Sequence, residues 1–530
     1  MEELFNLCCL NVLLRNVRSF IFTVTILTLG TAVFMLNGLP SEYDKIYFDQ
    51  FPAGFRFGIA TASYQVEGGA SHRGKNIWDT FSHTPGNIED GSTGDEACDS
   101  FRNYETDVKN VAALGLDFYR FSISWSRLIP TGVISEGISE SGLDYYHKLL
   151  NKLEEEKIEA MVTLYHWDLP QKLQDYGGWT NVSLAERFQE YADLCFKSFG
   201  PKVKRWITFN EPRETSLGGY EIGYMAPGYK LHGTGTYNTS YTILRAHAAA
   251  YRLYAERYRN LQFGEVGITL NCDWAQPVDN SVANRDAADR FLQWYIGIWA
   301  HPILLGDYPA VIKETVKSKT NAKGFRKSRL PEFSQDEIDY IKGTFDFLGL
   351  NSYTTRMVQY KQCSDEDDHY NCDQDLRAFA DPSWPTSGSS WLRPVPWGIR
   401  KLLSWIKHQY PNYREIVVTE NGVSDRPESV TLCDQPRVNF FQNYLNNVLM
   451  AIRIDEVNVV GYTAWSLMDN FEWAHGYTER FGLFWTSFDR PDKLRTMKAS
   501  GLFYKKIVES RGFPSKQTLL DWLEEVDNYC

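Results

Sequence analysis

The chain has 530 residues, of which 43% are hydrophobic and 23% charged, as in an ordinary globular protein. Its length allows either one large α/β domain or two to three smaller domains. The formal net charge of −12 excludes the basic surface that nucleic-acid-binding proteins carry, so we expect no nucleic-acid partner.

An apolar segment near the N-terminus differs in character from the rest of the chain. Arg15 and Arg18 precede an apolar run over residues 20–36, and a short stretch with glycine and proline ends that run. A basic flank, an apolar run and a break are the layout of a secretory signal. We therefore expect residues 1–38 to be a signal peptide, or a signal-anchor that stays attached. Residues 39–530 would then form one domain that is secreted or lies in the lumen of the secretory pathway.

Cysteines and sequons agree with that compartment. Cys363 and Cys372 lie close together in a polar, acidic stretch and are predicted to form a disulfide. The other internal cysteines are interpreted as small buried hydrophobic residues, and none has the spacing of zinc ligands. Neither a metal nor a cofactor is expected. The sequons at Asn181 and Asn238 are compatible with a glycoprotein.

Short apolar runs alternate with longer segments of helical period from residue 57 onward. Residues 143–157, 185–199 and 241–258, for example, carry apolar side chains three and four positions apart, as amphipathic helices do. Eight repeats of strand and helix predict an α/β fold, a single (β/α)8 TIM barrel. A doubly wound open sheet is the alternative, but no glycine-rich phosphate turn follows the first run. The eight runs are Phe57–Ala62, Phe118–Ile123, Ala160–Tyr165, Arg205–Phe209, Val266–Leu270, Phe345–Leu350, Ile416–Thr419 and Val459–Ala464.

Polar and aromatic residues follow several of these runs. The C-terminal ends of the strands form the face of a TIM barrel that carries its functional site. These residues should therefore meet at one mouth of the barrel. They are His166 after the third run, Asn210 and Glu211 after the fourth, Asn351 and Tyr353 after the sixth, Glu420 after the seventh, and Trp465, Glu472 and Trp473 after the eighth.

Two glutamates, Glu211 and Glu420, directly follow strands that should lie across the barrel mouth from one another. Cleavage of a glycosidic bond needs two carboxyl groups, one to protonate the departing oxygen and one to meet the developing oxocarbenium ion. We predict that Glu211 is the acid/base and Glu420 the nucleophile of a retaining reaction with a covalent glycosyl-enzyme intermediate. Arg120, in the second run, and the hydroxyl of Tyr353 would keep Glu420 ionised. The abundance of aromatic residues, at 15%, suits stacking on sugar rings as well as it suits a large core.

Three motifs carry a resemblance to a known family. Residues 208–212, Thr-Phe-Asn-Glu-Pro, and residues 418–422, Val-Thr-Glu-Asn-Gly, resemble the two glutamate signatures of glycoside hydrolase family 1. Residues 63–68, Ser-Tyr-Gln-Val-Glu-Gly, together with residues 76–79, Asn-Ile-Trp-Asp, resemble its N-terminal signature. The sequences of these motifs are most similar to those of the animal-type β-glucosidases of this family.

The resemblance implies an O-glycosyl hydrolase that takes a small-molecule glycoside, and it implies a role for each residue of the expected site. Trp391 would be an aromatic platform under the aglycone, and Asn351 and Tyr353 would lie near the nucleophile. Amide, imidazole and carboxylate groups can all bond sugar hydroxyls, which agrees with these roles. The implied pocket for the terminal sugar consists of Gln65, His166, Asn210, Trp465, Glu472, Trp473 and Phe481.

Two positions bear on the substrate. A carboxylate at Glu472 repels a phosphate, so a non-phosphorylated β-glucoside is implied, with fucosides and galactosides as further candidates. Arg213 and Glu214 stand where the family often has an aromatic or apolar residue. They form either an ion pair at the barrel rim or a site at which Arg213 binds an anionic aglycone such as a sulfate. The second reading describes a thioglucosidase (myrosinase) acting on glucosinolates, but plant myrosinases replace the acid/base glutamate, which is intact here as Glu211.

Two other functions use the same fold. A non-catalytic binding protein is disfavoured, because both glutamates are present together with Arg120, Asn210 and Tyr353. Transglycosylation to an acceptor other than water would use the same residues as hydrolysis, and the sequence does not separate the two.

Overall fold

The computed structural model describes residues 45–324, 326–363, 370–426 and 431–530. The signal segment predicted for residues 1–38 lies outside the described residues. Within the described ranges, no helix combines the length and the apolar character that crossing a membrane requires. Residues Tyr47–Cys530 form one compact unit.

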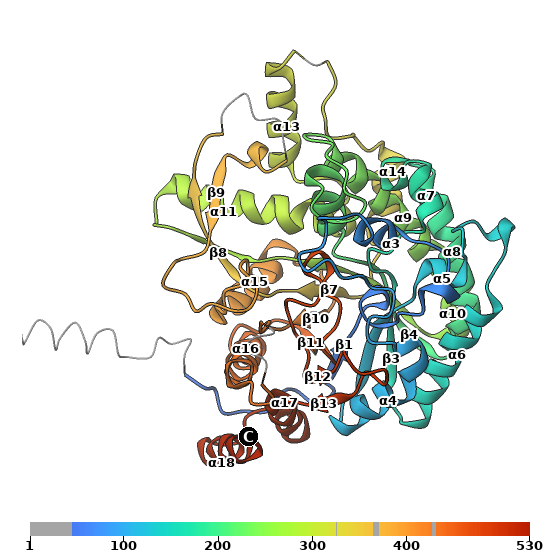
Figure 1. The fold of residues 1–530 in the computed structure, drawn as a ribbon. Helices are drawn as coiled ribbons and strands as arrows, with labels where there is room; N and C mark the ends of the chain where they lie inside the picture. The colour runs from blue at the N-terminus through green and yellow to red at the C-terminus, as the bar shows by residue number, and fades with distance from the viewer. Residues whose placement is uncertain (1–44, 325, 364–369, 427–430) are drawn as a thin grey trace, which may run out of the picture. The chain divides into compact units, whose positions relative to one another are not determined.

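Eight parallel strands close into a barrel (Figure 1), in the order β1, β11, β10, β7, β5, β4, β3, β2, with β2 pairing again with β1. Each of the eight apolar runs of the sequence forms one of these strands, so the predicted TIM barrel is confirmed. The strands are β1 (Arg56–Ala60), β2 (Phe118–Ser122), β3 (Glu159–Tyr165), β4 (Val203–Asn210), β5 (Glu265–Asn271), β7 (Leu348–Asn351), β10 (Ile416–Asn421) and β11 (Val459–Trp465).

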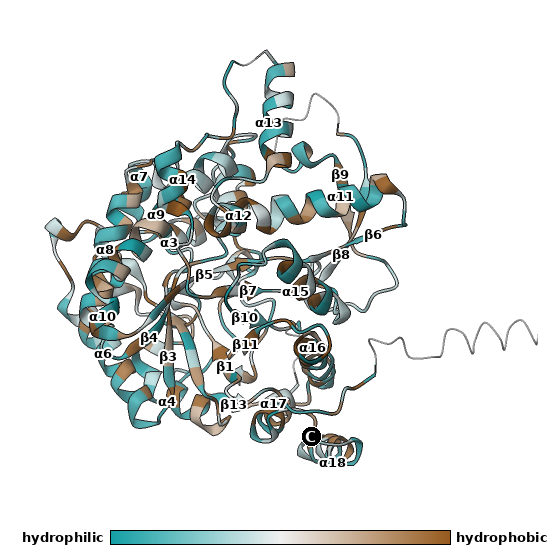
Figure 2. Cartoon of the chain, turned by 180° about the vertical axis from the view of Figure 1, so that it is seen from behind, coloured by the Kyte–Doolittle hydropathy of each residue, from teal (hydrophilic) through white to brown (hydrophobic). Residues whose placement is uncertain are grey.

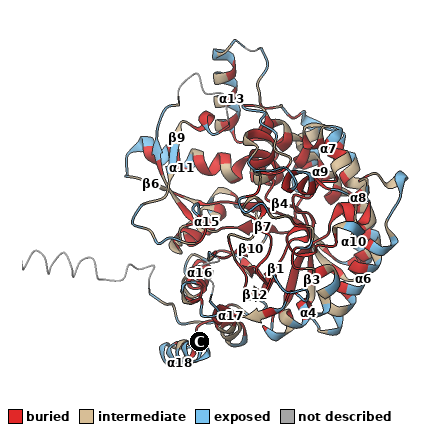
Figure 3. Ribbon diagram, viewed as in Figure 1, coloured by how far each residue is buried: buried red, intermediate tan, exposed pale blue. Residues whose placement is uncertain are grey.

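Helices surround the barrel, and the three helical segments named from the sequence form α6, α8 and α9. In α6 the buried side chains include Tyr146, Leu149 and Leu153, whose spacing of three and four places them on one face. Figure 3 shows buried strands at the centre and exposed outer faces on α6, α8 and α10, and Figure 2 shows that these outer faces are largely hydrophilic. The α-helices are α2 (Ser63–Val66), α3 (Ile77–Ser82), α4 (Ser100–Ala113), α5 (Trp125–Leu128), α6 (Glu140–Glu155), α7 (Gln171–Asp175), α8 (Leu184–Phe199), α9 (Gly235–Arg257), α10 (Arg259–Gln262), α11 (Val282–Leu292), α12 (Ile298–Leu304), α13 (Ala310–Ala322), α14 (Gln335–Ile341), α15 (Trp397–Gln409), α16 (Gln435–Arg453), α17 (Ala499–Ser510) and α18 (Lys516–Tyr529). The described residues also form two π-helical segments, η4 (Glu214–Ile222) and η5 (Gln293–Gly297), and the short 3-10 turns η1 (Ala70–His72), η2 (Ile134–Glu136), η3 (Gly178–Thr180), η6 (Cys372–Gln374) and η8 (Trp473–His475).

Two small sheets outside the barrel were not expected from the sequence. One joins β6 (Trp274–Pro277), β8 (Thr355–Tyr360) and β9 (Leu376–Phe379), and the other joins β12 (Phe484–Thr486) to β13 (Arg495–Met497). The strand β9 has no fully buried residue. With an arginine and no buried side chain, β9 lacks the apolar run from which the barrel strands were predicted.

The interior of the barrel is filled by side chains from four strands and from the residue that precedes β7. Phe118, Met161, Ile207, Phe347 and Val417 form one buried hydrophobic cluster. Alternate residues of a strand face the same side of a sheet, so Arg120 on β2 faces the interior as Phe118 does. The apolar layer therefore lies beneath a layer that carries charge.

The two strands that carry the glutamates are both irregular next to them. The pairing of β4 with β5 shifts register between Ile207 and Asn210, and the pairing of β10 with β7 shifts between Val418 and Glu420. A bulge turns the following side chain to a new direction, and bulges are frequent at the rims of barrels. These shifts allow Asn210 and Glu420 to face the barrel mouth although regular alternation would not place them there.

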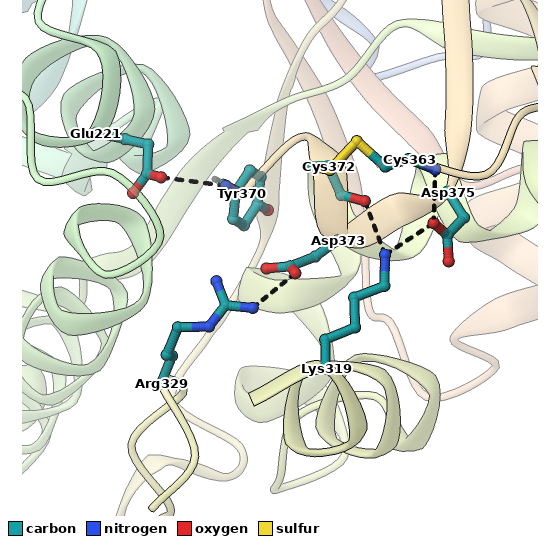
Figure 4. Close-up of a disulfide and its surroundings, with 8 residues drawn as sticks. All are labelled: Glu221, Lys319, Arg329, Cys363, Tyr370, Cys372, Asp373 and Asp375. Atoms are coloured by element: carbon teal, nitrogen blue, oxygen red, sulfur yellow. Dashed lines mark hydrogen bonds and ion pairs between the residues drawn. A yellow bond between two sulfur atoms is a disulfide. The ribbon is translucent and has the colours of Figure 1, made fainter. Parts of the chain in front are cut away.

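Two disulfides lie in the described part of the chain. The predicted bond between Cys363 and Cys372 is confirmed (Figure 4), with a Cα–Cα distance of 5.4 Å. The second bond joins Cys433 to Cys530, so the prediction that Cys433 is a buried small hydrophobe was wrong. That pairing joins segments 97 residues apart, and no local pattern in the sequence indicates it. Cys98, Cys195 and Cys272 are free and buried, as predicted.

Candidate active site

A cavity of about 600 Å³ opens at the C-terminal ends of the barrel strands, within the range of roughly 300–1,000 Å³ that is usual for small-molecule sites. Most of the predicted site residues line it. Gln65, Asn210 and Arg120 are instead buried behind the lining, where each bonds to a lining residue. The predicted residues that line the cavity are His166, Glu211, Arg213, Asn351, Tyr353, Trp391, Glu420, Trp465, Glu472, Trp473 and Phe481.

Each oxygen of the Glu420 carboxylate accepts a hydrogen bond from a fixed donor. Arg120 Nη1 donates to Oε1 at 2.7 Å, and the Tyr353 hydroxyl donates to Oε2 at 2.8 Å. Arg120 also donates to the Thr419 carbonyl at 2.8 Å and to Asn210 Oδ1 at 2.6 Å, so its guanidinium is held in place. Burial raises the pKa of Glu420, while the charge of Arg120 and the bond from Tyr353 oppose that rise.

The carboxyl group of Glu211 has an amide neighbour. Asn351 Nδ2 donates to Glu211 Oε1 at 2.6 Å. The pKa of Glu211 is raised well above its usual value, first by burial and then by the negative charges of Glu420 and Glu214. Because Arg120 stabilises charge on Glu420 most directly, the first proton that this pair binds resides on Glu211.

Three residues that line the cavity have backbone conformations that side-chain-bearing residues rarely adopt. The φ angles of Trp167, Glu211 and Trp473 are 75°, 43° and 52°. Strain of this kind persists only where the surrounding structure imposes it. The Glu211 amide donates to the Thr269 carbonyl at 3.0 Å, and Trp167 Nε1 donates to the Asn210 carbonyl at 2.9 Å. The fold as a whole therefore holds the side chains of this cavity in position.

One end of the cavity carries a carboxylate and a neutral donor. Gln65 Nε2 donates to Glu472 Oε2 at 3.2 Å and to Asn470 Oδ1 at 2.8 Å, which fixes the direction of the Glu472 side chain. The pKa of Glu472 is raised well above its usual value by its enclosure and then by the charges of Glu479 and Glu420. A carboxyl group so placed is ready to bond hydroxyl groups of a ligand.

His166 is near two tryptophans at the same end. Its ring centroid is 6.0 Å from that of Trp465 and 5.8 Å from that of Trp473, and both pairs are stacked. Asn210 Nδ2 donates to His166 Nε2 at 3.0 Å. Burial, and then the charge of Arg120, lowers the pKa of His166 well below its usual value, so the ring is neutral. Because Nε2 accepts the bond from Asn210, the proton of the neutral ring is on Nδ1. Nδ1 has no hydrogen-bond partner among the described residues and is available to a ligand.

Arg213 forms an internal ion pair at the other end of the cavity. Its Nη1 lies 2.5 Å from Glu214 Oε1, and its guanidinium lies 3.7 Å from the centroid of the Tyr295 ring. Glu214 also accepts hydrogen bonds from Asn271 at 2.9 Å and from the Tyr224 hydroxyl at 2.9 Å. The geometry corresponds to the first of the two readings of this pair, an ion pair at the barrel rim.

Several cavity residues were not predicted. Glu479 is 3% exposed and accepts a hydrogen bond from Ser389 Oγ. Its place in the same loop as Glu472 was the one available signal. Among other lining residues, Tyr295 lies in η5 and Arg356 lies in β8, a strand that the sequence did not indicate. Within the described ranges, no cluster of three or more His, Cys, Asp or Glu residues is arranged to hold a metal ion.

Comparisons with known proteins agree with this geometry. The sequence model described as glycosyl hydrolase family 1 matches residues 47–513. The lactase-like protein of Homo sapiens is 44% identical over 500 residues, which cover 93% of this chain and 88% of that protein. The solved structure of an aphid myrosinase has a TM-score of 0.83 at 42% identity and covers 87% of this chain and 99% of the myrosinase. A mutant rice β-glucosidase in a covalent complex with glucose has a TM-score of 0.82 at 37% identity and covers 86% and 98%.

Proposed function

Because the chain belongs to glycosyl hydrolase family 1, we propose that it is a retaining β-glycosidase that hydrolyses non-phosphorylated β-glucosides. That it is a glycosidase of the β-glucosidase type follows from the family. The proposal adds the stereochemistry, the roles of the two glutamates and the class of sugar.

The first half of the reaction transfers the sugar to Glu420. A carboxylate oxygen of Glu420 bonds to the anomeric carbon while the bond from that carbon to the aglycone oxygen breaks. Glu211 gives its proton to the departing oxygen, so the aglycone leaves as a neutral alcohol. Arg120 and Tyr353 orient the attacking carboxylate through the two hydrogen bonds that hold it.

The second half releases the sugar. Esterification removes the negative charge of Glu420, and that charge is one cause of the raised pKa of Glu211. Glu211 has already given its proton to the aglycone, and its lowered pKa keeps it ionised. It then accepts a proton from water as the water attacks the anomeric carbon. The ester bond to Glu420 breaks, and the product keeps the β configuration.

The observation that carries this proposal is the asymmetry of the carboxyl pair. Glu420 bonds to a guanidinium, whereas Glu211 bonds to an amide and has the more strongly raised pKa. A nucleophile must be ionised and a general acid must be protonated, and this environment favours that division of roles. The covalent glucose complex of the rice relative supports a covalent intermediate for this chain.

The end of the cavity with Glu472 and His166 would bind the terminal sugar. Glu472, the neutral His166 and the faces of Trp465 and Trp473 suit hydroxyl groups on a pyranose ring. Glu472 and Glu479 together disfavour a phosphorylated sugar, because a phosphate would meet two neighbouring carboxyl groups. Glucosides are proposed first, with fucosides and galactosides as further substrates.

A thioglucosidase is the second candidate, because the aphid relative is a myrosinase. In that case Arg213 would bind the sulfate of a glucosinolate. The ion pair of Arg213 with Glu214 argues against this, since the charge that would attract a sulfate is already neutralised. The intact Glu211 also favours O-glycosides, whose poor leaving groups need a proton.

We propose a secretory location because the chain has two disulfides, and disulfides persist in oxidising compartments. Of the two sequons, Asn181 is followed by exposed residues, whereas the Ser240 that completes the sequon of Asn238 is buried in α9. Glycosylation is therefore expected at Asn181 alone. Expression in animal cells with N-terminal sequencing and glycosidase treatment of the medium fraction tests this. Unglycosylated protein confined to the cytosol would contradict it.

Two experiments test the mechanism. NMR of the sugar first released from a β-glucoside should show the β anomer, and an initial α anomer would exclude retention. A 2-fluoro glucoside inactivator should label Glu420, which peptide mapping would locate. A label on any other residue would overturn the assignment of the nucleophile.

A further inference from the structure

Two buried threonine hydroxyls form a chain of hydrogen bonds that ends at the carboxyl group of Glu211. Thr269 Oγ1 donates to Thr419 Oγ1 at 3.1 Å, and Thr419 Oγ1 donates to Asn351 Oδ1 at 2.8 Å. The amide of Asn351 then donates to Glu211 Oε1 at 2.6 Å. The chain runs from β5 to β10 and on to β7, and all three of its members are fully buried. We call Thr269, Thr419 and Asn351 the Thr–Asn chain.

The orientation of the Asn351 amide is fixed by partners on both of its ends. An asparagine side chain carries two N–H donors at one end and a carbonyl acceptor at the other, so its partners decide which end faces a carboxylate. One N–H of Nδ2 bonds to Glu211 Oε1, and the other bonds to Asn210 Oδ1 at 3.1 Å. That oxygen of Asn210 also accepts from Arg120 at 2.6 Å, whereas Asn351 Oδ1 accepts from Thr419. Turning the amide over would set two oxygens without protons against each other, so the N–H end faces Glu211.

Thr269 determines where the hydroxyl proton of Thr419 points. A hydroxyl has one proton and can both donate and accept. Because Thr269 donates to the oxygen of Thr419, the proton of Thr419 is directed to Asn351. Gly349 leaves the room that this arrangement needs, since a Cβ there would lie 2.3 Å from Thr269 Oγ1. The backbone carbonyl of Thr269 also accepts from the Glu211 amide at 3.0 Å, so Thr269 supports Glu211 by two routes.

The bond from Asn351 makes the two oxygens of Glu211 unequal. Oε1 accepts an N–H bond from a fixed amide, so Oε2 is the better place for the proton of the carboxylic acid. From Oε2 the proton passes to the departing aglycone oxygen, and in the second half of the reaction the attacking water gives a proton back to Oε2. Burial raises the pKa of Glu211, and the bond from Asn351 opposes that rise because it stabilises the ionised form.

We propose that Thr419 and Thr269 are positioning residues that hold the Asn351 amide against Glu211 Oε1 and so confine the transferable proton of Glu211 to Oε2. Both threonine side chains are fully buried, and neither of them lines the cavity. They therefore act through Asn351 and do not touch the substrate. The proposal rests on the acid/base role proposed above for Glu211.

The charged groups around Glu211 stay in place when either hydroxyl is removed. Among the described residues, none of these groups bonds to the hydroxyl of Thr269 or of Thr419. A change in the titration of Glu211 in a hydroxyl variant is therefore assigned to the Asn351 amide. The ionisable groups that act on Glu211 are Glu420 on β10, Glu214 in η4, Arg120 on β2, and the phenols of Tyr353 and Tyr224.

The test replaces Thr419 by Val, which keeps the branched shape and the backbone carbonyl but removes the hydroxyl. Asn351 Oδ1 then loses its donor, and the amide is no longer held on Glu211 Oε1. The ionised form of Glu211 loses stabilisation, so the basic limb of the pH profile of kcat/KM should move up by about 1 pH unit. At the pH optimum of the wild type, kcat/KM should fall about tenfold for phenyl β-glucoside. It should fall much less for a dinitrophenyl β-glucoside, whose phenol leaves without a proton.

Three further variants serve as controls. Thr419→Ser keeps the hydroxyl, so its basic limb should coincide with that of the wild type. Thr269→Val should move the limb in the same direction but by less, because Thr419 keeps its proton and loses only the partner that directs it. Thr208→Val removes another buried hydroxyl of a barrel strand, one that bonds to His247 Nδ1 at 2.7 Å. It should lower Tm without moving the limb, which separates a loss of stability from the effect on Glu211.

The outcomes separate the two proposals. A wild type that turns over no β-glucoside contradicts the proposed function. An active wild type contradicts the role of the Thr–Asn chain alone if Thr419→Val keeps the wild-type basic limb, or if Thr419→Ser or Thr208→Val moves the limb as far as Thr419→Val does. If Thr419→Val does not fold, Thr269→Val takes its place, and an unshifted limb in that variant overturns the proposal.

Discussion

Replacing Glu211 by Gln removes a proton donor and changes little else at the site. The amide oxygen of glutamine can still accept the bond that Asn351 Nδ2 now makes to Glu211 Oε1 at 2.6 Å. The loss of a neutral hydrogen bond would cost about 0.5–1.5 kcal/mol. General acid catalysis contributes about 10²- to 10⁴-fold, which corresponds to about 2.7–5.4 kcal/mol of activation free energy. The missing proton therefore dominates the expected loss.

A series of aryl β-glucosides with phenols of increasing acidity measures this effect. We expect Glu211→Gln to lower kcat/KM about 10²- to 10⁴-fold for weakly acidic phenols and far less for dinitrophenol, which leaves without a proton. Azide should restore turnover of the dinitrophenyl substrate, because an anionic nucleophile needs no general base. The matched control is Glu214→Gln, a carboxyl group three residues away that is paired with Arg213. Its loss should be uniform along the series. An equally uniform loss for Glu211→Gln would refute its role as the acid.

Three further outcomes are expected. Glu420→Gln should lower the pKa of Glu211, followed by ¹³C NMR, because it removes a negative charge that raises this pKa. A pKa of Glu211 that does not fall in this variant would contradict the effect of the Glu420 charge. In the wild type, activity should be lost as pH rises through the raised pKa of Glu211, because the general acid then loses its proton. Glu472→Ser should reduce kcat/KM for glucosides by raising the activation free energy by roughly 2–4 kcal/mol. An unchanged kcat/KM would exclude contact between Glu472 and the sugar. Arg213→Ala should reduce turnover of a neutral aryl glucoside and of a glucosinolate by the same factor, since Glu214 already neutralises the arginine. A selective loss of about 10- to 150-fold on the glucosinolate would instead support the thioglucosidase.

The barrel and the carboxyl pair could be predicted because both depend on local patterns. An apolar run that ends in Glu211 or Glu420 specifies a strand and a side chain at its end, and the barrel topology then brings strand ends together. The direction of Glu420 depends in addition on a register shift, which no residue type announces. The family resemblance, and not the periodicity, was needed to include Gln65 and Trp391.

The parts that could not be predicted depend on distant segments. Tyr295 lies in a π-helical segment, and Tyr370 lies within the loop that the Cys363–Cys372 disulfide closes. Each reaches the cavity through packing between segments outside the barrel. The partner of Cys433 is equally distant in sequence. Residues placed by long-range contacts leave no period in the sequence, and Arg356, in the unpredicted strand β8, was missed for the same reason.

The closure of the barrel between β1 and β11 has a consequence for synthesis on the ribosome. The partner of Arg56–Ala60 on this side is Gly461–Trp465, so one edge of β1 stays unpaired until the ribosome has passed the last strand. At about 5–20 residues per second, that interval is roughly 20–80 s. During this time the nascent chain exposes an apolar strand edge that could pair with other chains. Only pairing with β11 covers this edge, so a chain released before Val459 has neither a closed barrel nor a complete substrate cavity.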